Sequence, residues 1–194
     1  IDICQGYFKT DSRIRFFKQH INLGALDNYK FVLTKSSGDY FIWLDADDYF
    51  ENSKHLEKLY DAIQNGFSLA FPNINIVNMN EEWKITKCDE NYFEFFSKAK
   101  TKFQMNIATI KKPTHQIYGL FRIEILRKYF HYFAEDESLH YFDESRFVHK
   151  VFSSENCIFV NDAFLNKIYH KTARSQMNTL RKKVLSFIVF TLKL

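Results

Sequence analysis

Apolar residues in the first part of the chain fall into short runs that are separated by helix-like stretches. The runs at 13–18, 40–44 and 67–71 are typical of strands, and 40–44 is apolar on both faces, as in a covered parallel sheet. Residues 26–33 and 56–63 carry apolar side chains at intervals of three and four, which predicts a helix in each. This alternation of strand and helix predicts an α/β fold.

The second half of the chain has a less regular pattern. The Asn65-Gly66 pair is expected to end the helix at 56–63, because glycine adopts the left-handed conformation that commonly follows a helix. The further elements that the pattern predicts are strands at 73–79, 157–160 and 163–170 and helices at 91–99, 123–133 and 143–152.

An acidic cluster, Asp45, Asp47 and Asp48, follows the apolar run at 40–44 directly. In doubly wound sheets, ligands bind beyond the carboxyl ends of the strands, so this edge is a candidate binding site. Three neighbouring carboxylates repel one another unless a positive group lies between them. We expect Asp45 and Asp47 to bind one divalent cation. Asp48 is expected either to cap the following turn or to bind a positive side chain.

Other interpretations of the cluster are open at this stage. A polar loop with an N-capping aspartate is the simplest. An EF-hand is excluded, because Phe50 and Leu56 stand where that loop needs Gly and Glu. A D-x-D phosphatase of the haloacid-dehalogenase type is a weaker alternative, since Tyr49 stands where Thr or Val is usual.

Composition describes a folded protein with one core. The chain has 194 residues, of which 46% are hydrophobic and 18% aromatic, with 5 Gly and 2 Pro. Its cysteines, Cys4, Cys88 and Cys157, are too widely spaced for a zinc site and odd in number, which favours a reducing compartment. The chain contains no run of about 18 apolar residues, so no membrane-spanning helix is expected.

Charge is distributed unevenly along the chain. The formal net charge is +4, yet residues 166–194 contain seven Lys or Arg and no acid, and the remaining residues sum to −3. A slightly acidic body argues against a nucleic-acid partner. The basic tail is expected either to contact an anionic membrane surface or to form a helix docked on the domain.

The segment from Asp11 to Phe50 resembles the family 2 glycosyltransferases of the GT-A fold. Those proteins have a strand, N-x-G, a helix with an early Asn, G-[DE]-[YF], an apolar strand and D-x-D-D. The matching residues are Asn22, Gly24, Asn28, Gly38, Asp39, Tyr40, Asp45, Asp47 and Asp48. The resemblance implies a GT-A-like, Rossmann-like, mostly parallel sheet flanked by helices over residues 1–175. For residues 176–194 we expect a basic and apolar C-terminal helix.

The resemblance also implies a chemistry. The donor would be a UDP- or dTDP-sugar, with Mg²⁺ or Mn²⁺ at its diphosphate. Asp47 would bind the metal, Asp45 would contact the ribose, the sugar or the metal, and Asn22, Gly24 and Asn28 would belong to the donor site. Transfer in this family inverts the anomeric carbon. The acceptor would be a glycan, free or lipid-linked, in bacterial-type surface polysaccharide, lipopolysaccharide or capsule synthesis.

Residues later in the chain match other parts of the family pattern. The acidic pair Asp143 and Glu144 opens a predicted helix, and the resemblance makes Glu144 the catalytic base, although the family usually has Asp there. Ordinary helix-start acids are the alternative, since acids suit the first turn of any helix. The stretch at 134–138 is a second acidic candidate.

The segment 166–175 resembles the closing segment of the family. By that match His170 is an additional metal ligand and Arg174 binds phosphate through its guanidinium. His115 and Tyr118 resemble residues near the acceptor in some members, although aromatic residues at this density are mostly core.

The family pattern normally starts with two strands and an Asp for the uracil base, which have no counterpart here. We therefore expect an N-terminally truncated domain. An inactive fragment or a binding module is the non-enzyme alternative. An active enzyme of this kind is expected in the cytoplasm, peripheral on the inner membrane face.

Overall fold

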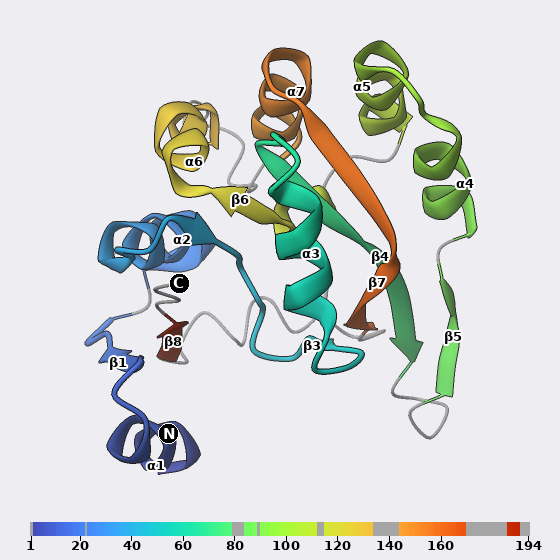
Figure 1. The fold of residues 1–194 in the computed structure, drawn as a ribbon. Coiled ribbons are helices and arrows are strands. Elements are labelled where there is room, and N and C mark those ends of the chain that lie inside the picture. The colour runs from blue at the N-terminus through green and yellow to red at the C-terminus, as the bar shows by residue number, and fades with distance from the viewer. Residues whose placement is uncertain are drawn as a thin grey trace. The chain divides into compact units, whose positions relative to one another are not determined.

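The computed structural model describes residues 2–21, 23–78, 84–88, 90–111, 115–133, 144–169 and 186–190 (Figure 1). The chain divides into two compact units. Unit 1 contains residues 1–41 and 171–194, and unit 2 contains residues 42–170.

Unit 1 has two helices and three short strands within the described residues: α1 (Asp2–Thr10), β1 (Ile14–Lys18), α2 (Gly24–Lys35), β2 (Tyr40–Phe41) and β8 (Ser186–Phe190). Phe17 of β1 packs edge-on against Phe31 of α2, with ring centroids 5.7 Å apart. The predicted strand at 13–18 and helix at 26–33 are confirmed. The strand predicted at 40–44 is limited to Tyr40 and Phe41.

The C-terminal segment differs from the prediction. Residues 186–190 form a strand that pairs antiparallel with β1, Ile14 lying opposite Phe190 and Lys18 opposite Ser186. The helix expected over 176–194 is therefore wrong at these five positions. The sequence SFIVF is rich in β-branched and aromatic residues, which favour a strand.

Unit 2 contains the remaining described elements. They are β3 (Tyr49–Phe50), α3 (His55–Ile63), β4 (Leu69–Asn78), β5 (Lys84–Cys88), α4 (Glu90–Lys98), α5 (Lys102–Lys111), η2 (His115–Tyr118), β6 (Leu120–Arg122), α6 (Ile123–Tyr129), η3 (Phe130–Phe133), α7 (Glu144–Ser154) and β7 (Cys157–Tyr169). None of the helices in the described ranges is both long enough and apolar enough to cross a bilayer.

The sheet of unit 2 is mixed. Its strand order is β6-β4-β7-β3, and β5 pairs with the far part of β4. The long central pair, β4 and β7, is parallel, whereas β5 and β6 run antiparallel to β4 and β3 runs antiparallel to β7. The predicted α/β class is confirmed, and the parallel part of this sheet is its central pair.

The two central strands are longer than the sequence pattern predicts. The segments predicted as separate strands at 67–71 and 73–79 join into β4, and those at 157–160 and 163–170 join into β7. The junctions coincide with an irregularity, because Pro72 lies opposite Val160 but Asn73 lies opposite Phe164. Proline lacks the N–H that a regular ladder needs, so a bulge is where a strand tolerates it.

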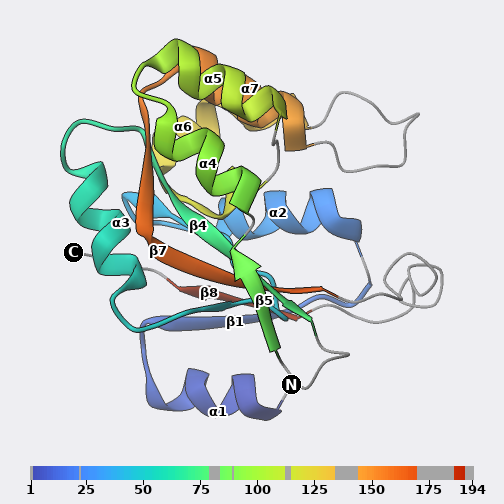
Figure 2. The same ribbon diagram turned by 90° about the vertical axis from the view of Figure 1, so that its right-hand side faces the viewer.

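Helices cover both faces of the central strand pair. Figure 2 shows α3 on one side of β4 and β7 and α4 on the other, and both helices contact both strands. On the α4 side, Phe71 packs against Phe96 and Phe152 with ring centroids 5.0 and 5.3 Å apart, and Tyr92 packs against Phe96 at 4.8 Å. Aromatic side chains of β4, α4 and α7 therefore form this part of the core.

His55, the first residue of α3, gives unit 2 a pH dependence. Its ring stacks on Phe50 at 4.3 Å and only 1% of the residue is exposed. Burial lowers its pKa to about 4, and the nearby Lys58 charge acts in the same direction. The folded state therefore keeps this ring neutral at pH values where the unfolded chain, with a pKa near 6.5, is protonated.

We expect stability to be lost as pH falls from about 6.5 to about 4, by up to about 3 kcal/mol from this residue. The His55→Phe variant should lose that part of the slope, because the unfolded chain then gains no proton there. Urea unfolding at pH 7 and pH 4.5 measures it, with His131→Phe as the control at an exposed histidine. Equal slopes for wild type and His55→Phe would contradict the assignment.

Candidate functional site

The acidic cluster occupies a short turn between a buried anchor and β3. Trp43 is 5% exposed and packs edge-on against Phe121 and Phe133, each with ring centroids 6.0 Å away. The amide of Asp48 donates a hydrogen bond to the carbonyl of Asp45 at 3.2 Å, which closes the turn. The local backbone thus gathers the acids whose sequence spacing suggested a common site.

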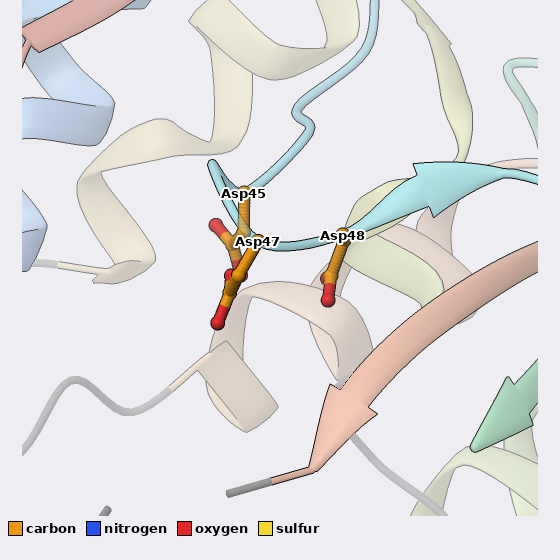
Figure 3. Close-up of side chains that lie close together, drawn as sticks. All are labelled: Asp45, Asp47 and Asp48. Carbon is orange, nitrogen blue, oxygen red and sulfur yellow. The ribbon is translucent and has the colours of Figure 1, made fainter. Parts of the chain in front are cut away.

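The carboxylates of Asp45, Asp47 and Asp48 lie close together. One oxygen from each falls within 4.8 Å of the others, and among the described residues this is the group of acids, histidines and cysteines that suits a metal ion. Figure 3 shows Asp45 and Asp47 side by side in the turn and Asp48 where β3 begins. Asp47 is exposed, Asp45 half-buried and Asp48 buried. Hard, all-oxygen donors of this kind fit Mg²⁺ or Mn²⁺.

Asp48 is held by β7 through both of its oxygens. Lys167 Nζ donates to Oδ2 at 2.9 Å, and the backbone N–H of Ile168 donates to Oδ1 at 3.1 Å. Burial raises the pKa of Asp48, and the Lys167 charge and these hydrogen bonds oppose that rise. Of the two roles expected for Asp48, the structure shows the contact with a positive side chain.

Asp45 has a different partner. The hydroxyl of Tyr118, at the end of η2, donates to Asp45 Oδ2 at 2.6 Å. Lys167 Nζ lies 3.8 Å from the centroid of the Tyr118 ring and 3.7 Å from Asp45 Oδ2. Tyr118 is 6% exposed, and the contacts given above are with Asp45 and Lys167, so its acceptor role stays a prediction.

Lys167 is the site residue that the sequence analysis missed. A signal was present, because Lys167 is the one charged residue of the stretch AFLNKIY at the end of β7. A lysine inside a mostly apolar strand needs a carboxylate partner, and the acidic turn supplies it. The sequence could not show which carboxylate, since 119 positions separate Lys167 from Asp48.

The structure gives positions for two further predicted site residues, Glu144 and His115, and their roles stay predictions. Glu144 is the first residue of α7 and is half-buried. His115 opens η2, with its ring edge-on to Tyr92 at 5.7 Å. Four other predicted site residues lie outside the described residues: Asn22, Asp143, His170 and Arg174.

Gly24 and Asn28 belong to unit 1. Gly24 opens α2 with a φ of +81°, a conformation that favours glycine. Asn28 is 1% exposed, and within the described part of the chain neither polar atom of its amide has a hydrogen-bond partner. Buried polar groups are normally paired, so an unpaired amide of this kind is a candidate ligand contact.

The family model described as Glycosyl transferase family 2 matches residues 1–130, which is most of the chain. The chain belongs to glycosyl transferase family 2. The match includes Gly24, Asn28 and the acidic turn, and it confirms the family that residues 11–50 predicted. A comparison with curated proteins finds no match.

Membership of glycosyl transferase family 2 makes the protein a glycosyltransferase and decides against the phosphatase alternative. That alternative also needed a Lys and a further acid pair around Asp45. Lys167 is near Asp45, but within the described ranges the acids gathered there are the three of the turn. Glu144 and Lys167 both follow residue 130, so their roles rest on the geometry of unit 2 and on the sequence pattern.

Proposed function

We propose that this family 2 glycosyltransferase moves a sugar from a UDP- or dTDP-sugar to a hydroxyl of a glycan acceptor, with inversion and with Mg²⁺ or Mn²⁺. The observation that carries the proposal is the acidic turn, whose carboxylates lie within 4.8 Å inside the range that matches the family. Its donor set suits a hard divalent cation that also binds phosphate oxygens. We further propose an acceptor in bacterial-type surface polysaccharide, lipopolysaccharide or capsule synthesis.

The residues of the turn would hold the cation that binds the donor diphosphate. Asp47 and Asp45 are the proposed metal ligands, with His170 as a third. The bound cation would supply charge neutralisation for the diphosphate as it leaves. Tyr118 donates to Asp45 and so fixes the orientation of that carboxylate before the donor arrives. A preorganised ligand needs no reordering when the substrate binds.

The proposed base is Glu144, with Asp143 beside it. Its carboxylate takes the proton of the acceptor hydroxyl as that oxygen forms a bond to the anomeric carbon. The bond from the anomeric carbon to the diphosphate oxygen breaks on the opposite face, and the nucleoside diphosphate departs. Asn22, Gly24, Asn28 and Arg174 are proposed for the donor, and His115 and Tyr118 for the acceptor.

Membrane contact and location are also proposals. The C-terminal tail, with its basic cluster at Arg181, Lys182 and Lys183, would contact anionic headgroups of the inner membrane face and bring the enzyme to a lipid-linked acceptor. This would place the enzyme in the cytoplasm, peripheral on the inner membrane face.

A thermal-shift titration with UDP or dTDP, with and without Mn²⁺, tests the proposed function. At a concentration about 100 times the Kd, a ligand of the native state adds about 2.7 kcal/mol, or about 5–10 °C in a chain of this size. We expect this shift with metal and a smaller one without it. If neither nucleotide raises the melting temperature in either condition, the proposal fails for this chain.

Asn28→Leu separates ligand binding from stability. Because the Asn28 amide is buried and has no partner among the described residues, we expect the leucine variant to be unchanged in stability or stabilised by about 1 kcal/mol. If Asn28 contacts the donor, the UDP shift should largely disappear.

Gln19→Leu is the matched control for this experiment. Gln19 is also in unit 1, is 8% exposed and has an amide without a partner among the described residues, but it has no proposed donor role. We expect this variant to keep the UDP shift. A full UDP shift in Asn28→Leu would remove Asn28 from the donor site.

A further inference from the structure

The acidic turn already contains a cation of its own. The ammonium of Lys167 lies 2.9 Å from Asp48 Oδ2, 3.7 Å from Asp45 Oδ2 and 3.8 Å from the Tyr118 ring centroid. Its side chain is 23% exposed, so water screens it only partly. Any metal ion bound at this turn must share the carboxylates with this ammonium.

We propose that Lys167 is a positioning residue that reserves Asp48 as its own counter-ion and makes metal binding at Asp45 and Asp47 depend on the donor diphosphate. This inference rests on the proposed function and adds a lysine to it. It assigns Asp48 to the support of the turn and not to the metal.

Asp48 is committed on both sides. The side chain is only 2% exposed, one oxygen accepts from Lys167 and the other accepts from the Ile168 amide. Each of these oxygens keeps a second lone pair, but a metal ion bound there would lie next to the ammonium in a buried environment, and the two cations would repel each other unless the ammonium were displaced. Removing one partner of a buried ion pair is costly, because the other charge is left without compensation. The contacts of Asp48 with Lys167 and Ile168 also tie the acidic turn to β7.

Asp45 and Asp47 are more accessible to a ligand. Asp45 is half-buried, and its contact with Lys167 at 3.7 Å is longer than the Asp48 contact. Asp47 is the exposed member of the group. A cation can therefore approach these two carboxylates without disturbing the contacts of Asp48 with β7.

The charges explain the dependence on the diphosphate. The three aspartates and Lys167 together sum to a charge of −2 when ionised, which one divalent cation neutralises. The ammonium repels that cation, so the site binds metal weakly by itself. A bound diphosphate would add negative charge to the site and so offset the repulsion between the metal ion and the ammonium. Metal and diphosphate must then strengthen each other's binding by the same factor.

The test is Mn²⁺ binding by the full chain, measured from the loss of the free Mn²⁺ signal in electron paramagnetic resonance, with and without UDP. In wild type, we expect UDP to tighten Mn²⁺ binding at least about tenfold. In Lys167→Met, Mn²⁺ alone should bind about tenfold more tightly and the effect of UDP should shrink. Lys167→Arg keeps the charge and should restore the wild-type pattern.

A charge-balanced double variant covers the case in which Lys167→Met fails to fold. Asp48→Asn with Lys167→Met removes one charge of each sign, and the Asn oxygen can still accept from the Ile168 amide. We expect its Mn²⁺ affinity to stay within about threefold of wild type, because the two removed charges are opposite and cancel at the metal, and neither group ligates it. Asp47→Asn, by comparison, should lose Mn²⁺ binding.

Each outcome has one meaning. If the double variant loses Mn²⁺ as severely as Asp47→Asn, then Asp48 is a ligand and the inference is wrong. If folded Lys167→Met binds Mn²⁺ with wild-type affinity and wild-type response to UDP, the ammonium has no such role. If wild type binds no Mn²⁺ even with UDP, metal dependence itself fails and the proposed function fails with it.

Discussion

Replacing Asp47 by Asn is expected to lower kcat/KM by about 10³-fold, because the variant loses a proposed ligand of the metal that would neutralise the leaving diphosphate, and such neutralisation contributes several kcal/mol. The substitution keeps the size of an exposed side chain, so stability should change by less than about 0.5 kcal/mol. Sugar transfer or donor hydrolysis measures the first effect, and urea unfolding measures the second.

Glu144→Gln is the companion variant. It also removes one carboxylate without changing size, but at the proposed base it should reduce kcat and leave the Mn²⁺-dependent UDP shift intact. Asp47→Asn should lose both. If Asp47→Asn retains a wild-type UDP shift with Mn²⁺, the metal is not bound by Asp47 and the assignment of the turn must be revised.

Replacing Gly119 by Ala is expected to destabilise the protein by about 2–3 kcal/mol. A methyl group at Gly119 would lie 2.6 Å from Leu69 Cδ1, 2.7 Å from the Ala70 carbonyl oxygen and 2.9 Å from Phe71 Cβ. One of these neighbours is backbone of the central strand β4, which cannot move without disturbing the sheet. Thermal or urea unfolding measures the effect, with an expected fall of about 5–10 °C in melting temperature.

Gly119→Ala should also disturb the acidic turn. Gly119 follows Tyr118, whose hydroxyl binds Asp45, so a displaced turn would move that hydrogen bond. Gly6→Ala is the matched control, because Gly6 lies in α1 and a methyl group there meets no atom within 4 Å. It should stabilise by up to about 1 kcal/mol through helix propensity. Similar stability of the two variants would show that β4 accommodates the methyl group.

Local sequence patterns were sufficient for several helices and for the acidic turn. Apolar spacing located α3, α4 and α7, and Asn65-Gly66 marked the end of α3, with Gly66 at a φ of +85°. The helix α5 was not predicted, because it also carries apolar residues on its exposed side. Phe103 and Ile110 are 74% and 60% exposed, so the apolar positions in the sequence do not mark one buried face. Its start was readable, since Thr101 and Gln104 cap each other through side-chain contacts with backbone amides at 3.2 Å.

What the sequence alone determined is the family, through N-x-G, the early Asn of α2 and D-x-D-D, because those residues lie close together along the chain. Tertiary structure alone decided their partners. Lys167 reaches Asp48 across 119 positions and Tyr118 reaches Asp45 across 73, because the order and register of the strands bring those segments together. Residue spacing describes neighbours within one element. The counter-ion of the acidic turn comes from another element, and only the folded sheet shows which residue it is.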